Sequence, residues 1–253
     1  MDRLADSAGV PWAGRHFSPT AFSGDDGSAP PGLLAALTAL RAGTGGQAEV
    51  LEALRGVRLL VPLLAQLGES GVGPTGLTVD KSAELALVTV AAPDGRRVLP
   101  TFTSVDAMRR WNPSARPIPV ESERIALAAA AEGTDLVVLD PLSETEFVVR
   151  RPAVWALGRG LPWRPAAGDP EVQAAFAEGA GEPAVRGVRL DAGDPAATLA
   201  GPELVVELSL VDGLDRTGLD ALLARIGERW ASSPVIAERV DSLAVRVVST
   251  RSS

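Results

Sequence analysis

Three hydroxyl side chains surround Phe102: Thr101 and Thr103 flank it, and Ser104 follows. The pattern places them where an extended segment ends and a helix begins. Hydroxyls and the free backbone N–H groups of a helix start can hydrogen bond to a ligand, and those N–H groups favour an anion. The alternative is structural: Ser104 caps the helix, and the threonines belong to an edge strand.

Lys81 is the only lysine of the chain. A small titratable ammonium can act as a base, form a Schiff base or clamp a negative charge, which a guanidinium does less well. We therefore add Lys81 to Thr101, Thr103 and Ser104 as a candidate ligand-binding set. A solvated lysine at the border of a loop and a strand is the alternative. The single histidine, His16, has no acid or hydroxyl at a suggestive spacing, so we interpret it as a surface or packing residue.

Two glycine-containing segments resemble binding loops only in part. Residues 25–28 (DDGS) lack the alternating acids and the closing Glu of a calcium loop, so they predict a turn. Residues 71–76 (GVGPTG) lack the Lys-Ser/Thr of a phosphate-binding loop, so they predict a hairpin loop.

The missing residue types exclude several chemistries. With no cysteine there is no disulfide, thiol nucleophile, sulfur carrier, or Cys-ligated zinc or iron–sulfur cluster. One histidine excludes a site that needs two imidazoles from one chain. The net charge of −8 argues against general binding to nucleic acid. We expect no enzyme activity, no cofactor and no metal site.

Tryptophan and arginine gather in the middle of the chain. Tryptophan often anchors a protein partner, because it buries a large area and keeps a polar N–H group. Arg150 and Arg151 precede Trp155, and Trp163 lies between a proline and an arginine. With Trp111 they form a candidate partner-binding set. The alternative is that these rings, with Trp12, seal the N-terminal arm and the domain junction.

The pattern along the chain predicts an α+β fold with α/β character and two mixed-sheet domains. Residues 1–31 form an extended arm with three aromatic rings, residues 32–160 a first domain, 161–170 a linker, and 171–253 a small second domain. In the first domain we expect helices at 31–42, 47–55, 105–111, 122–132 and 151–157, and strands at 57–66, 84–92, 96–102, 116–121, 135–140 and 146–150. Pro100 suggests that its strand lies at an edge or a bulge.

The second domain has a simpler plan. We expect a helix at 172–178, strands at 184–190 and 203–211, a helix that begins with a Thr217/Asp220 capping box, and a last strand at 243–247. This order predicts a helix on an antiparallel or mixed sheet. The first ten residues have no apolar signal region, and the longest apolar stretches are too short for a membrane span, so we expect a cytoplasmic protein with no membrane partner.

A resemblance to a known family rests on motifs in the first domain. These are Leu99-Pro100-Thr101-Phe102-Thr103-Ser104, the helix residues Met108 and Trp111, and the segment 136–141 (LVVLDP). Together with 79–89 and Phe147, they resemble the SseB N-terminal domain over roughly residues 33–157. Asp140 stands where the pattern often has Asn. The second domain is similar in place to a C-terminal SseB-like domain, and the opening residues resemble the longer actinobacterial members.

The resemblance implies a cytoplasmic two-part protein, and it supplies no catalytic residues or cofactor. Three hypotheses stay open. The first is a non-catalytic interaction or regulatory module with an unknown protein partner. The second is a small-ligand binder or an enzyme of amino-acid (serine) metabolism that uses Lys81 and the Thr101–Ser104 cluster. The third is a structural subunit of a homo-oligomer. We favour the first.

Overall fold

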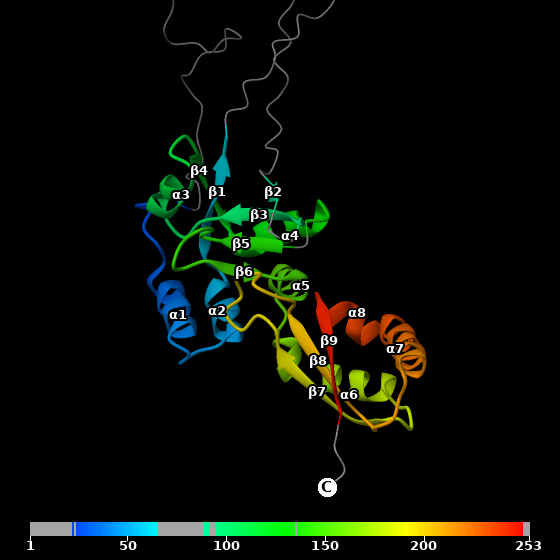
Figure 1. Cartoon of the computed structure of the whole chain (residues 1–253). Helices are drawn as coiled ribbons and strands as arrows, with labels where there is room; N and C mark the ends of the chain where they lie inside the picture. Colours follow the sequence, from blue (N-terminus) through cyan, green and yellow to red (C-terminus); the bar gives the residue numbers. More distant parts are fainter. Residues whose placement is uncertain (1–21, 23, 65–88, 92–94, 135, 250–253) are drawn as a thin grey trace, which may run out of the picture.

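The chain folds into two lobes that follow one another in the sequence (Figure 1). The computed structural model describes residues 22, 24–64, 89–91, 95–134 and 136–249 of the 253-residue chain. Helices and strands occur in both lobes, which confirms the α+β class. Lys81, His16, Trp12 and the glycine-rich segment 71–76 lie outside the described residues.

The N-terminal lobe combines five helices with strands in two sheets, counted over the described residues. Its helices are α1 Pro31–Arg41, α2 Gln47–Leu54, α3 Val105–Trp111, α4 Ser122–Ala131 and α5 Arg151–Arg159. Its strands are β1 Arg58–Leu63, β2 Val90–Ala91, β3 Arg97–Thr101, β4 Arg116–Glu121, β5 Leu136–Leu139 and β6 Phe147–Val149. The predicted helices are therefore present, and so are the predicted strands where the structure describes them, with ends that differ by a few residues. Residues 84–88 of the predicted strand 84–92 lie outside the described residues.

The two sheets meet at one bridge. Strands β1 and β4 form an antiparallel pair, and the larger sheet has the order β2-β3-β5-β6 with β3 and β5 parallel. Leu60 of β1 and Phe102, just after β3, exchange backbone hydrogen bonds of 2.8 and 2.9 Å. This bridge holds the segment that carries the predicted hydroxyls between both sheets.

The prediction for Pro100 is wrong. Strand β3 lies between β2 and β5, and Pro100 pairs with Val138 of β5. The described pairs with β2 involve Arg97 and Val98, ahead of the proline. A parallel neighbour binds a given residue through alternate backbone groups, so a proline can sit inside a sheet where its missing N–H is not needed.

The apolar pattern of α1 sets its packing. Pro30 and Pro31 open the helix, which suits proline in a first turn, and Leu33 and Leu37 are each 1% exposed. Burying a leucine side chain stabilises a fold by about 1.5–3 kcal/mol. The backbone of Gly43 has a positive φ of 69°, the conformation typical of a helix C-terminus.

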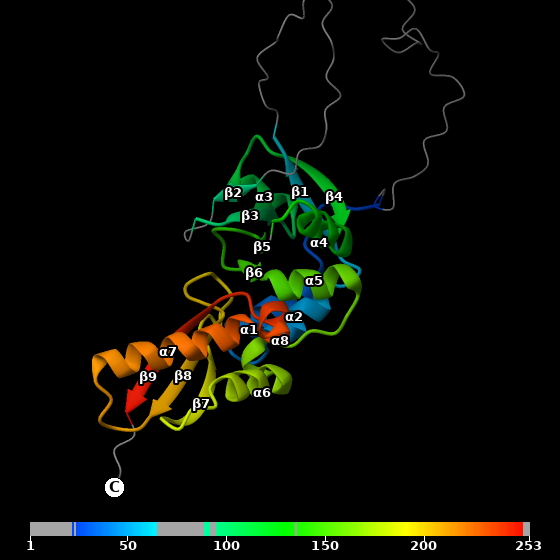
Figure 2. The same ribbon diagram turned by 90° about the vertical axis from the view of Figure 1, so that its right-hand side faces the viewer.

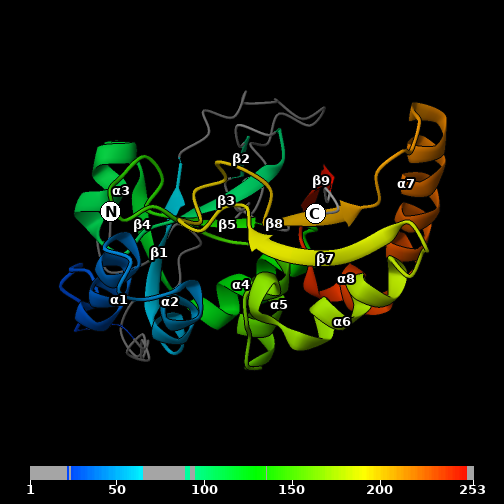
Figure 3. The same ribbon diagram turned by 60° about the horizontal axis from the view of Figure 1, so that its bottom comes forward.

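The C-terminal lobe is a three-stranded sheet with helices. Its elements are the 3-10 helix η1 Ala166–Gly168, the helices α6 Pro170–Gly179, α7 Arg216–Ala231 and α8 Pro234–Arg239, and the strands β7 Val185–Ala192, β8 Leu204–Leu210 and β9 Leu243–Ser249. The strand order is β7-β8-β9, antiparallel and then parallel, so the predicted mixed sheet is confirmed (Figures 1 and 3).

Strand β8 is the centre of the second core. Its side chains alternate between buried and half-buried, as a sheet covered by helices on one face requires. Phe176 of α6 and Trp230 of α7 meet edge to face with ring centroids 4.9 Å apart, and the Trp230 indole donates to the Phe176 carbonyl at 3.0 Å. These contacts hold α6 against α7, and both rings belong to the core cluster that contains the buried side chains of β8.

The predicted capping box at Thr217 is wrong. Helix α7 begins earlier, and Asp215 is its N-cap: its Oδ1 accepts a hydrogen bond from the Gly218 amide at 2.7 Å. Asp and Thr are both common N-caps, and the sequence contained both within three residues. In the part of the chain that the structure describes, no helix has the length and apolar character that crossing a bilayer demands.

Candidate functional site

A strained turn follows β5. Asp140 and Leu142 have positive φ values of 46° and 64°, in the left-handed region that non-glycine residues rarely enter. Left-handed backbone costs an L-residue roughly 1–2 kcal/mol, and such residues persist only where their surroundings hold them. We call residues 140–145 the β5 turn.

The buried carboxylate of Asp140 holds the start of the β5 turn. Its Oδ1 accepts from the Thr103 amide at 2.8 Å, and its Oδ2 accepts from the hydroxyls of Thr103 and Thr145 at 2.7 and 2.8 Å. The residue is 1% exposed. All three donors are neutral, so in this cluster the carboxylate is satisfied by hydrogen bonds alone.

Further hydrogen bonds close the β5 turn. The Ser143 hydroxyl donates to the Asp140 carbonyl at 2.7 Å and accepts from the Thr145 amide at 3.1 Å. The Leu142 amide donates to the Glu146 carboxylate at 2.7 Å. The backbone of the turn is therefore fixed, whereas the Leu142 side chain is 88% exposed.

Helix α3 stands beside the β5 turn. Ser104 is its N-cap, because its hydroxyl accepts from the Ala107 amide at 3.1 Å, which confirms the capping interpretation. At the other end Trp111 is half-buried against Phe102, with ring centroids 5.3 Å apart. Arg110 is exposed.

The β5 turn and α3 enclose a groove of about 410 Å³, which we call the α3 groove. It is lined by Ala107, Arg110 and Trp111 of α3 and by residues 141–145. Its apolar walls are an indole ring and an exposed leucine, and its polar edge has a guanidinium and the Glu144 carboxylate. Such a mixture suits one large apolar side chain with a charged neighbour.

The predicted threonines Thr101 and Thr103 are buried and do not line this groove. Thr101 is 0% exposed, and its hydroxyl donates to the Val138 carbonyl at 3.2 Å. Thr103 is 2% exposed and is bound to Asp140. Both hydroxyls donate hydrogen bonds to groups of the same chain. The hydroxyl of Thr103 thereby helps to hold Asp140 at the start of the β5 turn.

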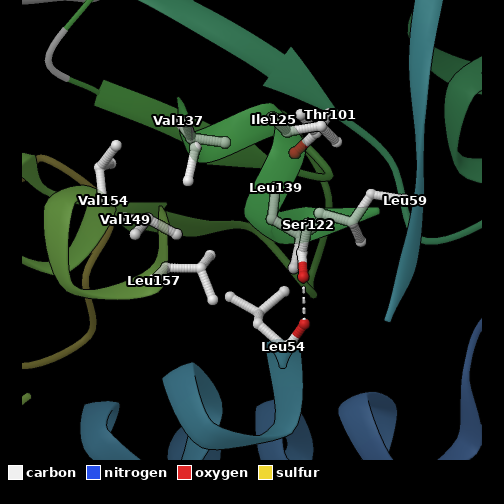
Figure 4. Close-up of a pocket in the computed structure, with 11 residues that line it drawn as sticks. Leu54, Leu59, Thr101, Ser122, Ile125, Val137, Leu139, Val149, Val154 and Leu157 are labelled. Atoms are coloured by element: carbon white, nitrogen blue, oxygen red, sulfur yellow. Dashed lines mark hydrogen bonds between the residues drawn. The ribbon is translucent and has the colours of Figure 1, made fainter. Parts of the chain in front are cut away.

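Thr101 also borders an enclosed core cavity, shown in Figure 4. The cavity has about 10 Å³, room for about one water molecule, and leucine, valine and isoleucine side chains line most of it. The Ser122 hydroxyl, which also lines the cavity, donates to the Leu54 carbonyl at 2.5 Å. This cavity is a packing space and holds no group free to bind a ligand.

The structure places Arg150 at the junction of the lobes. Its guanidinium donates to Asp194 at 2.6 Å, to Asp241 at 3.0 Å and to the Gly201 carbonyl at 2.9 Å, and the side chain is 5% exposed. Arg96 also binds Asp241, at 2.9 Å. Arg150 therefore joins the N-terminal lobe to the C-terminal lobe, and its position offers no surface to a separate partner.

The other members of the predicted partner-binding set are spread over the same junction. Arg151 donates to the carbonyls of Ala237 and Val240 and lies over the Trp155 ring, 5.1 Å from its centroid. Trp155 is 36% exposed. Trp163 packs against the N-terminal core, and its Nε1 is buried without a hydrogen-bond partner among the described residues. Trp111 alone of the set borders the α3 groove.

Glu203 lies beside this junction. Its carboxylate accepts from the Asp241 amide at 2.5 Å. Burial and, to a lesser extent, the charge of Asp241 raise the pKa of Glu203 from 4.5 to about 7, although Arg150 acts in the opposite direction. We therefore expect the stability of the junction to depend on pH near neutrality.

A second strained loop completes the junction. Residues 193–201 lie in the connection between β7 and β8, and within them Ala197 and Leu199 have positive φ values of 52° and 57°. The Asp194 carboxylate accepts from the amides of Thr198 and Leu199 at 3.1 and 2.9 Å. Ala197 is 1% exposed within the N-terminal core. We call this segment the junction loop.

Sequence reasoning did not predict the strained backbone of the β5 turn. Asp140 and Pro141 belong to the motif 136–141, but no local pattern predicts the left-handed backbone conformation of Leu142. The run Pro-Leu-Ser after a buried strand indicated only a connection. Among the described residues, no cluster of three or more His, Cys, Asp or Glu side chains is placed to hold a metal ion.

The comparisons with known proteins identify the N-terminal lobe. Residues 33–156 match the family model described as the SseB protein N-terminal domain. No curated protein and no solved structure matches the chain. The matched residues include α3 and the β5 turn, and they end before the junction loop.

Proposed function

Because residues 33–156 match the SseB protein N-terminal domain, we propose that this chain is a non-catalytic protein-interaction module that binds its partner in the α3 groove. The proposal keeps the cytoplasmic location predicted from the sequence. The observation that carries it is the β5 turn: two left-handed residues, fixed by a buried carboxylate, present Leu142 to solvent beside Trp111.

The left-handed backbone of the β5 turn has a cost in free energy that the contacts of the Leu142 side chain do not explain. A relaxed turn with glycine would connect β5 to β6 at lower cost. Here the hydrogen bonds to Asp140 hold Leu142 in place, although its side chain makes little contact within the described chain and is 88% exposed. Residues held in this way concentrate at binding sites, where fixing the backbone in advance lowers the entropy cost of association.

The lining of the α3 groove indicates the kind of partner. Trp111 and Leu142 are suited to a large apolar side chain, and aromatic anchors of this type carry most of the energy at protein interfaces. Arg110, and Arg109 nearby on α3, are exposed cations that would bind a carboxylate. We infer that the groove binds an extended peptide segment with one large apolar residue next to an acidic one.

The ligand-binding alternative has less support. Its hydroxyls are engaged within the chain: Thr101 with Val138, Thr103 with Asp140, and Ser104 as an N-cap. The remaining member of that set, Lys81, lies outside the described residues. No observation in the described residues favours an enzyme of serine metabolism.

A peptide selection tests the proposed function. A random peptide library displayed on phage is selected on the full chain, with the Leu142→Asp variant as counter-selection. We expect enriched peptides with an apolar residue beside an acidic one, and binding at least about tenfold weaker to Leu142→Asp, since 1.4 kcal/mol corresponds to a factor of ten.

Leu161→Asp is the matched control, because Leu161 is 49% exposed but does not line the α3 groove. Peptides that bind the wild type, Leu142→Asp and Leu161→Asp equally would overturn the assignment of the groove. So would a purified chain that turns over a metabolite.

A further inference from the structure

We propose that the free edge of β9 pairs, antiparallel, with β9 of a second copy of this chain, about a two-fold axis at Val245. This surface belongs to the C-terminal lobe. It is separate from the α3 groove, and the proposal does not depend on the proposed function.

The apolar side chains of β9 are left uncovered. In β8 the residues that face the helices are Leu204, Val206 and Leu208, each 0% exposed. Their direct neighbours on β9 point to the same face but are more exposed. The exposed fractions are 37% for Leu243, 42% for Val245 and 39% for Val247. The helices therefore cover β8, but the sheet extends one strand beyond their cover.

Among the described residues, the outward backbone groups of the same residues also have no partner strand. The Leu204 amide donates to the Ser242 carbonyl at 3.1 Å, so Ser242 faces β8. Because backbone groups alternate along a strand, the N–H and C=O groups of Leu243, Val245 and Val247 point away from β8. No described strand lies beyond β9, which stands at the end of the sheet in Figures 1 and 2.

An edge of this kind is a template for another strand. Natural proteins protect long edges with charges directed inward, prolines or bulges. Strand β9 has seven residues, no proline, and one charged side chain, Arg246, which lies on the face away from the apolar row. An exposed edge with an apolar row is therefore expected to be covered in the assembled protein.

The charge of Arg246 selects the register. Several antiparallel arrangements use the outward backbone groups, and they differ in the residue that lies on the axis. With the axis at Arg246, the two arginines stand directly opposite each other in a close non-hydrogen-bonded pair, which is unfavourable. With the axis at Val245, Arg246 stands opposite Ala244 of the second copy, and Leu243 stands opposite its Val247. The apolar row is then self-complementary, as a two-fold interface requires.

The ion pairs of Arg246 favour a second copy over an acidic foreign strand. Its guanidinium already binds Glu207 at 2.8 Å and Asp191 at 3.2 Å within the same chain. No acidic residue is needed opposite it. A two-fold axis perpendicular to the sheet also keeps the helices of both copies on one face, so the two apolar rows meet.

Sedimentation velocity of the full chain over a range of concentrations tests this proposal. We expect a reversible dimer. Val245→Pro removes one outward N–H and the central apolar side chain, while proline remains compatible with an edge strand. Val245→Lys places two cations on the axis. Each variant should weaken the dimer at least about tenfold.

Leu142→Lys, which removes an exposed leucine from the other lobe, is the control and should leave the dimer unchanged. Ala244→Glu is a gain-of-function variant, because it places a carboxylate opposite Arg246 of the second copy. It should tighten the dimer several-fold. It also keeps the test valid if the Val245 variants fail to fold.

Three results would overturn the proposal. A wild-type chain that stays monomeric at every concentration has no such interface. A dimer that folded Val245 variants leave unchanged uses another surface. A dimer that Ala244→Glu weakens has a different register.

Discussion

The β5 turn and the junction loop are held by the same kind of hydrogen bonds, but their side chains lie in different surroundings. Each contains two left-handed residues that are not glycine, and each is held by a buried aspartate that accepts hydrogen bonds from nearby donors. The aspartate of the β5 turn, Asp140, has neutral donors only. The aspartate of the junction loop, Asp194, also binds Arg150.

The two loops differ in the burial of their left-handed residues. Ala197 of the junction loop is 1% exposed, and its carbonyl accepts from the Val148 amide of β6 at 2.8 Å. Leu142 of the β5 turn is 88% exposed. In the junction loop, contacts within the chain offset the strain. In the β5 turn, the Leu142 side chain makes little contact within the described chain, and we propose that a partner contacts it.

Removing the aspartate of the junction loop gives the largest expected effect. Asp194→Ala leaves the buried Arg150 without one of its two anions and frees two backbone amides. Breaking a buried ion pair costs roughly 3–5 kcal/mol. We expect a loss of this size in the free energy of unfolding, measured by urea titration.

Asp191→Ala is the control for Asp194→Ala. Asp191 is 34% exposed and pairs with Arg189 and Arg246 at the surface, where such pairs contribute about 0–1 kcal/mol. If the two alanine variants lose equal stability, the junction loop is not held by its buried aspartate, and the comparison between the loops fails.

The pH dependence of the junction is the second largest effect. The pKa of Glu203 is raised from 4.5 to about 7, so the folded chain keeps a proton that the unfolded chain releases above pH 4.5. Stability from this group is therefore greatest below pH 4.5 and is lost as the pH rises through 7, by at most about 3 kcal/mol.

Glu203→Gln should remove this slope, since an amide oxygen can still accept from the Asp241 amide. Urea titrations at pH 5 and pH 8 compare it with the wild type. Glu207→Gln is the control: hydrogen bonds from Arg189 lower the pKa of Glu207, so the slope between these pH values should remain. A wild-type chain equally stable at both pH values would contradict the pKa assigned to Glu203.

Local patterns were sufficient to predict most elements of both lobes, although the short helix α8 was not predicted. The apolar spacing of α1, the N-cap Ser104 and the alternation in β8 each depend on neighbours within a few residues, and each is confirmed. The capping residue of α7 was wrong because two candidates lay close together. Pro100 was wrong because its place depends on which strands flank it.

The sites could not be predicted in the same way. Thr103, which binds Asp140, and Asp194, which binds Arg150, lie 37 and 44 residues away, and nothing local shows that these charges become buried. The hydroxyls of Thr101 and Thr103 were identified as a cluster, but whether a hydroxyl faces a ligand or a buried carboxylate is decided by packing between strands. The left-handed Leu142 has no local signal.

Glycine substitutions give the smallest effects on stability and the sharpest contrast between the loops. Leu142→Gly relieves a left-handed residue whose side chain is exposed, so it should raise the free energy of unfolding by up to about 1 kcal/mol. Ala197→Gly relieves the same conformation but removes a buried methyl group, worth about 0.8 kcal/mol, so it should be nearly neutral. Urea titration measures both.

The binding of a selected peptide to Leu142→Gly tests the central claim most directly. Isothermal titration is carried out on Leu142→Gly and Ala197→Gly beside the wild type. The account predicts that Leu142→Gly is at least as stable as the wild type and binds the peptide about tenfold or more weakly, while Ala197→Gly binds it normally. Wild-type affinity in a stable Leu142→Gly variant would contradict it.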